Sequence, residues 1–488
     1  MIRRHVTPAL IAFLVLLGGC LLAPRLPGAW RVMLVLCGVT AAAALPALRL
    51  SRRAAILLFS VAVGSFLGAA SSAGMDAARN GSYLPMPQSS VSEMRGVVTQ
   101  DSSLSQRGQT VLHLSLRSAA SAQRGVAADA RGGVLLLIPG DHRFSIGQIL
   151  KLRAAPADFD VVGADRFIAR AELGSVRALG FTSPLWAFRA ECRSWLHRAV
   201  SGAGYPASAL MEALLVGSRE DVPSSLYDGF LRTGSLHILA LSGLHVTVIY
   251  GIVVGLLLFI RRKWVRFLIA AVVLLFYQFI AGFMPSLLRA TVMIIVGGIA
   301  LLIDRDREPL NALSLAGIVI LLIDPFQAFT LSFQLSFLAL LGILTVGPLI
   351  QRPLSGHVPR FLLMPLAMSV GAQVATLPLV VAQFGAYYPS GLAAGLLLVP
   401  LTTGFLWAGL AWLPLSLVSW PALHDLMGRG FDLLYRVTEG CAQIFARLPG
   451  VTPSPAAIPW IVGSSILVLV FLGVFLPRRS RPAAMGRA

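Results

Sequence analysis

The stretch that decides the fold class is WVRFLIAAVVLLFYQFIAGFMPSLLRATVMIIVGGIALLI, residues 264–303. It holds two apolar runs, 264–283 and 286–303, and its formally charged side chains are two arginines. A helix needs about 20 apolar residues to cross a bilayer, and proline is tolerated in the first turn of a helix but breaks its interior. The stretch therefore predicts two membrane-spanning helices with a break at Pro285.

Apolar runs of comparable character recur along the chain, which is 56% hydrophobic and only 12% charged. They lie at about 7–23, 30–48, 54–74, 236–260, 310–323, 329–349, 361–382, 391–419 and 458–476. Such a composition requires lipid as the solvent for much of the chain. We expect a mainly α polytopic membrane protein with about 10–12 transmembrane helices. Pro400 and Pro414 are expected to divide the run at 391–419 into two shorter helices, and 424–447 is expected to be amphipathic.

A soluble domain is expected after the third apolar run, where the sequence changes to Ser, Arg, Gln and Gly. Five strand candidates follow, at 95–99, 111–116, 134–138, 149–153 and 169–179. In the second, Leu112, Leu114 and Leu116 alternate with more polar residues, which indicates a strand buried on one face. Five strands in about 90 residues suit a small all-β barrel such as an OB fold.

These features predict five segments: N-terminal transmembrane helices (1–75), an extracytoplasmic OB-like β domain (76–183), an interfacial amphipathic helix (184–204), a transmembrane domain (205–477) and a basic cytoplasmic tail (478–488). The interfacial helix is indicated by Leu185, Trp186, Phe188 and Arg189, which combine aromatic and cationic side chains. An alternative for the N-terminus is a lipoprotein-type signal peptide ending at Cys20. Three apolar runs in tandem favour a membrane bundle instead.

The formal net charge of +19 comes mostly from arginines in clusters between the apolar runs. Clusters at 49–53, 261–266, 305–307, 352–360 and 478–481 can all be cytoplasmic at once, which satisfies the positive-inside rule and places the β domain outside. A high net charge is also typical of nucleic-acid-binding proteins, but membrane topology is sufficient to explain these basic residues. The four cysteines are scattered without a metal-binding or redox spacing, and the sequence holds no phosphate loop for ATP, so neither a cofactor nor a resident motor is predicted.

The polar segment ALLVGSREDVPSSLYDGFLRTGSLHILALSGLHVTVIY (213–250) lies where the apolar runs resume. Ionisable groups in or near lipid are costly, so they are expected to face protein or water. On one helix His237 and His245 would share a stripe, with Ser242 and Gly243 able to open the backbone between them. Packing histidines are an alternative, whereas a metal site would need ligands that the segment lacks, and a serine hydrolase would need a nucleophile elbow. No catalytic residue is predicted.

Polar islands inside later apolar runs add further candidates. Together the residues expected to line a polar path are Arg219, Asp221, Arg232, His237, Ser242, Gly243, His245, Ser286, Arg289, Gln334 and Gln373. Each of the polar islands inside the later apolar runs is, taken singly, more often a site of helix–helix hydrogen bonding than a functional site.

The segment from Ala213 to Val246, with its Gly-x-Arg, Phe-x-x-x-Gly and His-x-Leu-Ala-x-Ser-Gly-Leu-His pattern, closely resembles the ComEC/Rec2 competence proteins. The resemblance continues through PSLLRA, NALSLA, FQLSFLA and QVATLPL, and Gly96 and Gly147 are placed as in that family's outer barrel. Gly395 stands where the family tends to have asparagine. The chain shows no HxHxDH motif and is similar to a form without the C-terminal metallo-β-lactamase-like domain, so any nuclease step would need another protein.

The resemblance implies an inner-membrane channel, not an enzyme, that carries single-stranded DNA into the cytoplasm during natural transformation. It implies as partners a periplasmic DNA receptor and cytoplasmic DNA-binding or motor proteins, in a lipid bilayer, with a homo-oligomer left open. The alternatives are a small-molecule or lipid transporter that uses the same polar islands, and a non-conducting truncated relative.

Overall fold

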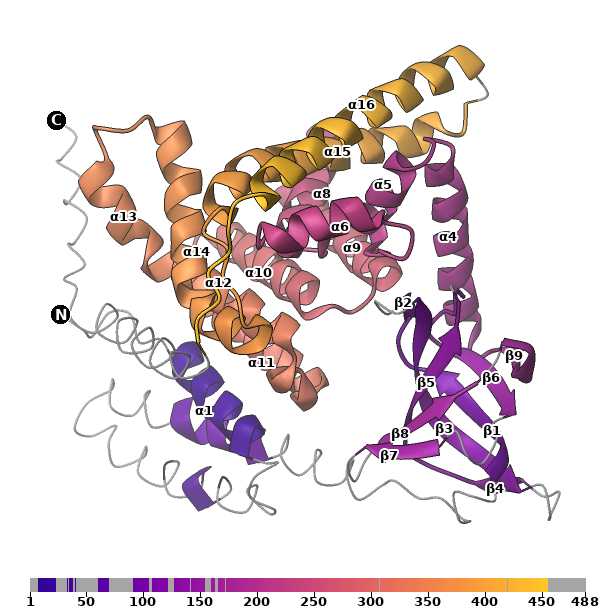
Figure 1. Ribbon diagram of the computed structural model, residues 1–488. Coiled ribbons are helices and arrows are strands. Elements are labelled where there is room, and N and C mark those ends of the chain that lie inside the picture. Colours follow the sequence, from indigo (N-terminus) through magenta and orange to yellow (C-terminus); the bar gives the residue numbers. More distant parts are fainter. Residues whose placement is uncertain are drawn as a thin grey trace.

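A computed structural model describes residues 8–22, 33, 35–37, 40, 60–69, 91–104, 108–121, 127–140, 142–153, 159–162, 166–171, 173–306, 308–418 and 420–454. In Figure 1 a β domain stands beside a larger helical bundle, and α4 (Pro184–Ser201) leads from one to the other. Within the first 90 residues the structure describes chiefly α1 (Pro8–Leu22) and a helix at Ser60–Ala69. The apolar run at 458–476 and the tail lie outside the described residues, as does most of the run at 30–48.

The β domain forms a sheet of order β7-β8-β5-β3-β1-β6-β9, with β2 and β4 paired to β3. Its strands are β1 (Val91–Val98), β2 (Ser103–Leu104), β3 (Gln109–Ser121), β4 (Ala127–Asp129), β5 (Gly133–Pro139), β6 (Gln148–Arg153), β7 (Phe159–Val162), β8 (Arg166–Arg170) and β9 (Val176–Phe181). The β5–β8 pair is parallel and the other pairs are antiparallel. With β8 and β9 taken as one interrupted strand, this is the pairing of an OB-like Greek-key barrel.

The predicted β domain is confirmed, but its fifth strand is not the single strand 169–179. A short 3-10 helix at Leu173–Ser175 separates β8 from β9, so that β8 pairs with β5 and β9 pairs with β6. The predicted alternation in β3 is confirmed, because Leu112, Leu114 and Leu116 are all almost fully buried. One face of this strand supplies the core of the domain.

The helical bundle begins with α5 (Ala207–Val216), α6 (Ser224–Arg232), α7 (Leu236–Leu239), α8 (Gly243–Leu256), α9 (Lys263–Ala281), α10 (Pro285–Leu302) and α11 (Pro309–Ile323). It continues with η5 (Pro325–Phe329), α12 (Leu331–Thr345), α13 (Gly347–Leu354), α14 (Arg360–Phe384), α15 (Gly391–Leu415) and α16 (Pro421–Ala446). Among the described residues, five helices are long and apolar enough to cross a membrane, and several shorter apolar helices pack among them. The protein is therefore a multi-pass membrane protein.

Two of the predicted helix breaks have different outcomes. The break at Pro285 is confirmed, because α9 ends at Ala281 and this proline begins α10. The break predicted in 391–419 is wrong, since α15 runs on through Pro400 and Pro414. Tertiary packing outweighs the prolines: buried Phe405 and Trp412 fix the helix against the core.

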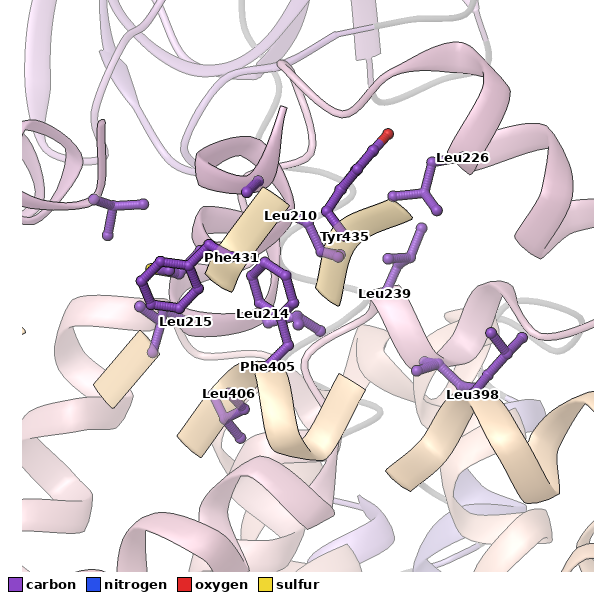
Figure 2. Packing of buried hydrophobic residues seen from close by; sticks show 14 of the residues in the cluster. Leu210, Leu214, Leu215, Leu226, Leu239, Leu398, Phe405, Leu406, Phe431 and Tyr435 are labelled. Carbon is purple, nitrogen blue, oxygen red and sulfur yellow. The ribbon is translucent and has the colours of Figure 1, made fainter. Parts of the chain in front are cut away.

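The core of the bundle lies where α5, α6, α15 and α16 meet (Figure 2). Leu210 and Leu214 of α5 pack with Phe405 of α15, whose ring centroid lies 5.8 Å from that of Phe431 on α16. The predicted amphipathic character of 424–447 is confirmed in α16, because its opposite side carries exposed ion pairs such as Asp425–Arg429. This core packs the helices of the polar segment against α15 and α16.

Candidate functional site

The polar segment forms the end of α5, all of α6 and α7, and the first part of α8, with an extended break between the two histidines. His237 lies in α7 and His245 lies in α8, and Ser242 between them has φ −121° and ψ 169°. The single helical stripe predicted for the histidines is therefore wrong, whereas the predicted opening of the backbone at Ser242 and Gly243 is confirmed. Serine is favoured as the residue before a helix because its side chain and backbone can both join a cap.

His245 forms the cap of α8 with Ser242. The Ser242 backbone N–H donates to Nδ1 of His245 over 3.1 Å, and the Ser242 hydroxyl lies 2.9 Å from the same nitrogen. Because Nδ1 accepts from a backbone N–H, the neutral imidazole carries its proton on Nε2. With 5% of its surface exposed, His245 is almost completely buried.

Arg289 of α10 joins three helices at this break. A Cβ placed on Gly243 would lie 3.2 Å from Nη2 of Arg289, so the absence of a side chain lets the guanidinium approach α8. Nη1 of Arg289 donates to the backbone carbonyl of Ser336 on α12. We call Ser242, Gly243, His245, Arg289 and Ser336 the Arg289 cluster.

Several buried polar atoms in and beside this cluster have no hydrogen-bond partner among the described residues. They are Nε of Arg289, Oγ of Ser336 and Nε2 of Gln278. Thr291 of α10 donates to Oε1 of Gln278 on α9 over 3.2 Å. This bond holds the Gln278 amide against α10, the helix that carries Arg289. A buried polar atom without a hydrogen bond costs free energy. A polar group that forms hydrogen bonds with these atoms would remove that cost and would therefore be bound favourably.

No side-chain hydrogen bond or ion pair found among the described residues links the other predicted path residues to the Arg289 cluster. Ser286 lies one turn before Arg289 on α10. Gln334 donates to the carbonyl of Ala328 over 2.9 Å and so fixes the turn before α12. Gln373 accepts from the hydroxyl of Tyr387 over 2.8 Å, which ties α14 to the loop that follows it.

The remaining predicted residues lie on the α5–α6 loop and the α6–α7 corner. Arg219 is half-buried in the loop, and Arg232 is exposed at the last turn of α6. His237 is exposed, and its Nδ1 lies 3.3 Å from the carbonyl of Gly234. Asp221 pairs with Arg143 of the β domain, so its contact is between domains.

Arg143 lies at the centre of an acidic group that sequence reasoning missed. Its Nη1 donates to Oε1 of Glu212 over 3.1 Å, and its Nε lies 3.5 Å from Glu220. His197, Glu212 and Asp221 have ligand atoms within 4.8 Å of one another, as metal ligands would. The guanidinium already contacts all three, so a cation from the protein itself fills this position. The partners lie 69 and 78 residues from Arg143, beyond the reach of local patterns.

Comparison with known proteins places most of the bundle in one family. The profile of the family described as Competence protein matches residues 214–480, which is more than half of the chain and includes the Arg289 cluster. An uncharacterized protein of Aquifex aeolicus is 31% identical over 255 residues, which are 52% of this chain and 59% of that protein.

ComE operon protein 3 of Bacillus subtilis is 30% identical over 200 residues, which are 40% of this chain and 25% of that protein. The uncharacterized protein YcaI of Escherichia coli is 26% identical over 212 residues, which are 41% of this chain and 28% of that protein. The chain thus spans between a quarter and three fifths of the length of these relatives, and no solved structure matches it. Because the profile covers more than half of its length, the chain belongs to the competence protein family.

Proposed function

We propose that this protein is a channel of the bacterial inner membrane that passes single-stranded DNA into the cytoplasm during natural transformation. The family match, to a profile described as Competence protein, supports a role in competence, and the similar Bacillus subtilis protein is ComE operon protein 3. The structural observation that carries the proposal is the Arg289 cluster. It places a guanidinium with an unpaired Nε at the meeting point of three apolar helices.

A polyanion that crosses a membrane through a protein needs cationic groups such as Arg289 along its route. Each nucleotide carries a negative charge, so its transfer through hydrocarbon requires cations and hydrogen-bond donors along the route. Arg289 supplies one charge, and Ser336 and Gln278 supply unpaired polar atoms nearby. A single arginine contacts phosphate without reading the base, so the route is expected to accept any sequence.

The β domain offers a cationic row outside the helical bundle. Arg95 on β1 pairs in register with Lys151 on β6, which pairs in register with Arg177 on β9. The row is only partly neutralised, because Glu93 lies 2.8 Å from Lys151 while both arginines are exposed. A DNA strand can bind this row before it reaches the bundle, and we propose that the strand arrives there from a periplasmic DNA receptor.

The experiment is a transformation assay in the native host on a clean deletion complemented with the wild-type chain or with Arg289→Gln. Loss of this partly buried cation is expected to lower uptake at least tenfold, since one charged hydrogen bond contributes about 1.5–3 kcal/mol. Arg305→Gln is the matched control, because Arg305 is exposed beyond the opposite end of α10. Normal transformation of the deletion strain would refute the proposed function.

A small-molecule transporter is the second candidate, and one observation favours it. A cavity of about 540 Å³ lies beside Arg143, lined among others by His197, Glu212 and Asp221. The three carboxylates of Glu212, Glu220 and Asp221 outnumber the one charge of Arg143, so the lining keeps a net negative charge that suits a small cationic or neutral solute and would repel DNA. In the same deletion strain, a nutrient or envelope defect with normal transformation would support this candidate.

A further inference from the structure

A second arginine, Arg189 of α4, is more completely buried than Arg289. Within the described part of the chain it is, unlike Arg289, paired with a carboxylate. Only 1% of its surface is exposed. Its Nη1 and Nη2 donate to the two carboxylate oxygens of Asp101 over 2.8 Å and 2.6 Å. Asp101 belongs to the β domain, in the loop after β1, so this bidentate pair crosses from the β domain to α4.

Arg189 and a second arginine of α4, Arg193, also hold the end of α9. Nε of Arg189 donates to the carbonyl of Phe279 over 2.6 Å, and Nη1 of Arg193 donates to the carbonyl of Ile280 over 3.1 Å. The last carbonyls of a helix lack partners within it and carry its negative dipole end, so two cations there are favourable. Arg193 lies 3.3 Å from Asp101 as well.

Apolar contacts join the same three parts of the protein, which are the β domain, α4 and α9. The Trp186 ring of α4 stacks on Phe279 of α9 with centroids 5.8 Å apart. A Cβ on Gly147 of the β domain would lie 2.4 Å from Cγ of the same Trp186 side chain. Gly147 also has a positive φ of 80°, so two constraints require glycine at this position.

We infer that Asp101, Arg189 and Arg193 form a joint through which the β domain positions the turn between α9 and α10, and with it Arg289. Only three residues separate Ala281, the last of α9, from Pro285, the first of α10, and Arg289 follows one turn later. Gly282 in this turn has φ 112°, and a Cβ there would lie 3.7 Å from Nη2 of Arg189. The joint is thus in contact with the turn that begins the Arg289 helix.

The Arg143 group gives the β domain a second attachment with the charges reversed. At the joint the β domain supplies the carboxylate and the helices supply the cations; at Arg143 the β domain supplies the cation and the loop after α5 supplies Asp221. Two attachments of opposite sign allow one docking of the domain and disfavour others. The β domain therefore holds the turn as a rigid body.

This inference rests on the proposed function only for its consequence on uptake, so the test has two readouts. Asp101→Asn and the milder Arg193→Gln are compared with Asp129→Asn, an exposed carboxylate of the same domain. Hydrogen exchange of peptides covering 279–288 in the purified full chain is expected to speed up on the order of tenfold in the first two variants and not in the third.

Transformation measured at equal membrane levels is expected to fall with Asp101→Asn and Arg193→Gln. Unchanged exchange in both variants would show that the β domain does not position the turn, and would overturn the inference. Faster hydrogen exchange with unchanged uptake would mean that the joint holds the turn but does not affect the function of Arg289. That result would overturn the positioning role. Unchanged uptake in the deletion strain refutes the proposed function alone, because the exchange result stands without it.

Discussion

Substitution of Gly342 by alanine tests how closely the helices around the Arg289 cluster must pack. A Cβ on Gly342 of α12 would lie 2.1 Å from the carbonyl oxygen of Gly371 on α14 and 2.6 Å from Cβ of Ala375. Small residues at such crossings let membrane helices approach until their backbones touch. Ordinary contact begins near 3.4 Å, so the two helices must separate by about 1.3 Å to admit one methyl group.

The magnitude follows from two opposing effects. Overpacking of this kind costs about 1–3 kcal/mol, whereas replacing a glycine inside a helix by alanine gains about 0.5–1 kcal/mol. The variant is therefore expected to lose roughly 1–2 kcal/mol. Gly297→Ala in α10 is the matched control, because a Cβ on Gly297 meets nothing within 4 Å and only the gain applies.

Thermal unfolding of the purified chain in detergent measures both variants. The unfolding midpoint is expected to fall for Gly342→Ala and to stay or rise for Gly297→Ala. Uptake is expected to fall with the first variant, since α12 also carries the Ser336 carbonyl that accepts from Arg289. A Gly342→Ala protein as stable as the control would refute the reasoning that the backbone contact limits this crossing.

The joint and the cationic row give two further predictions. Burial acts to raise the pKa of the Asp101 carboxyl, but Arg189 and Arg193 stabilise the carboxylate and lower that pKa overall. The ion pair therefore contributes its full stability above the ordinary pKa of about 3.9, and this stability is lost only as the pH falls through the lower pKa of the folded state. Hydrogen exchange of the α9–α10 turn should then be equally protected between about pH 8 and 5 after correction for the intrinsic rate, and loss of protection near pH 6 would contradict the ion pair. Arg95→Ser with Arg177→Ser should weaken binding of a fluorescent single-stranded oligonucleotide and reduce the slope of log affinity against log salt by about 1.4, whereas an unchanged slope would exclude the row from phosphate contact.

The sequence predicted what depends on local pattern. Apolar length marked the membrane helices, alternation marked β3, and Pro285 marked the boundary between α9 and α10. The cost of charge in lipid pointed to Arg289 and to the segment around Gly243, which the structure brings into contact. The predictions of the membrane helices, of β3 and of the Pro285 boundary succeeded because each depends on residues close together in the chain.

Contacts between distant segments could not be predicted in the same way. Asp101 and Arg189 are 88 residues apart, and their pairing depends on how the β domain sits on α4. One local signal was present, because Trp186, Arg189 and Arg193 have the spacing of a single helix face and all three reach toward α9. The contact of Gln334 could not be predicted either, since its side chain bonds to the carbonyl of Ala328 in the turn before α12.

The direction of α9 links the joint to the orientation of the protein. Its 19 residues span about 28 Å, which is close to the thickness of the hydrocarbon core. Lys263 and the adjacent arginines lie at its first end, and the joint with the β domain lies at its last, so the basic cluster and the β domain are a full span apart. Under the positive-inside rule this arrangement supports an extracytoplasmic β domain. Arg289, in the second turn of α10, is then near the outer surface, where an incoming strand would meet it early in its passage.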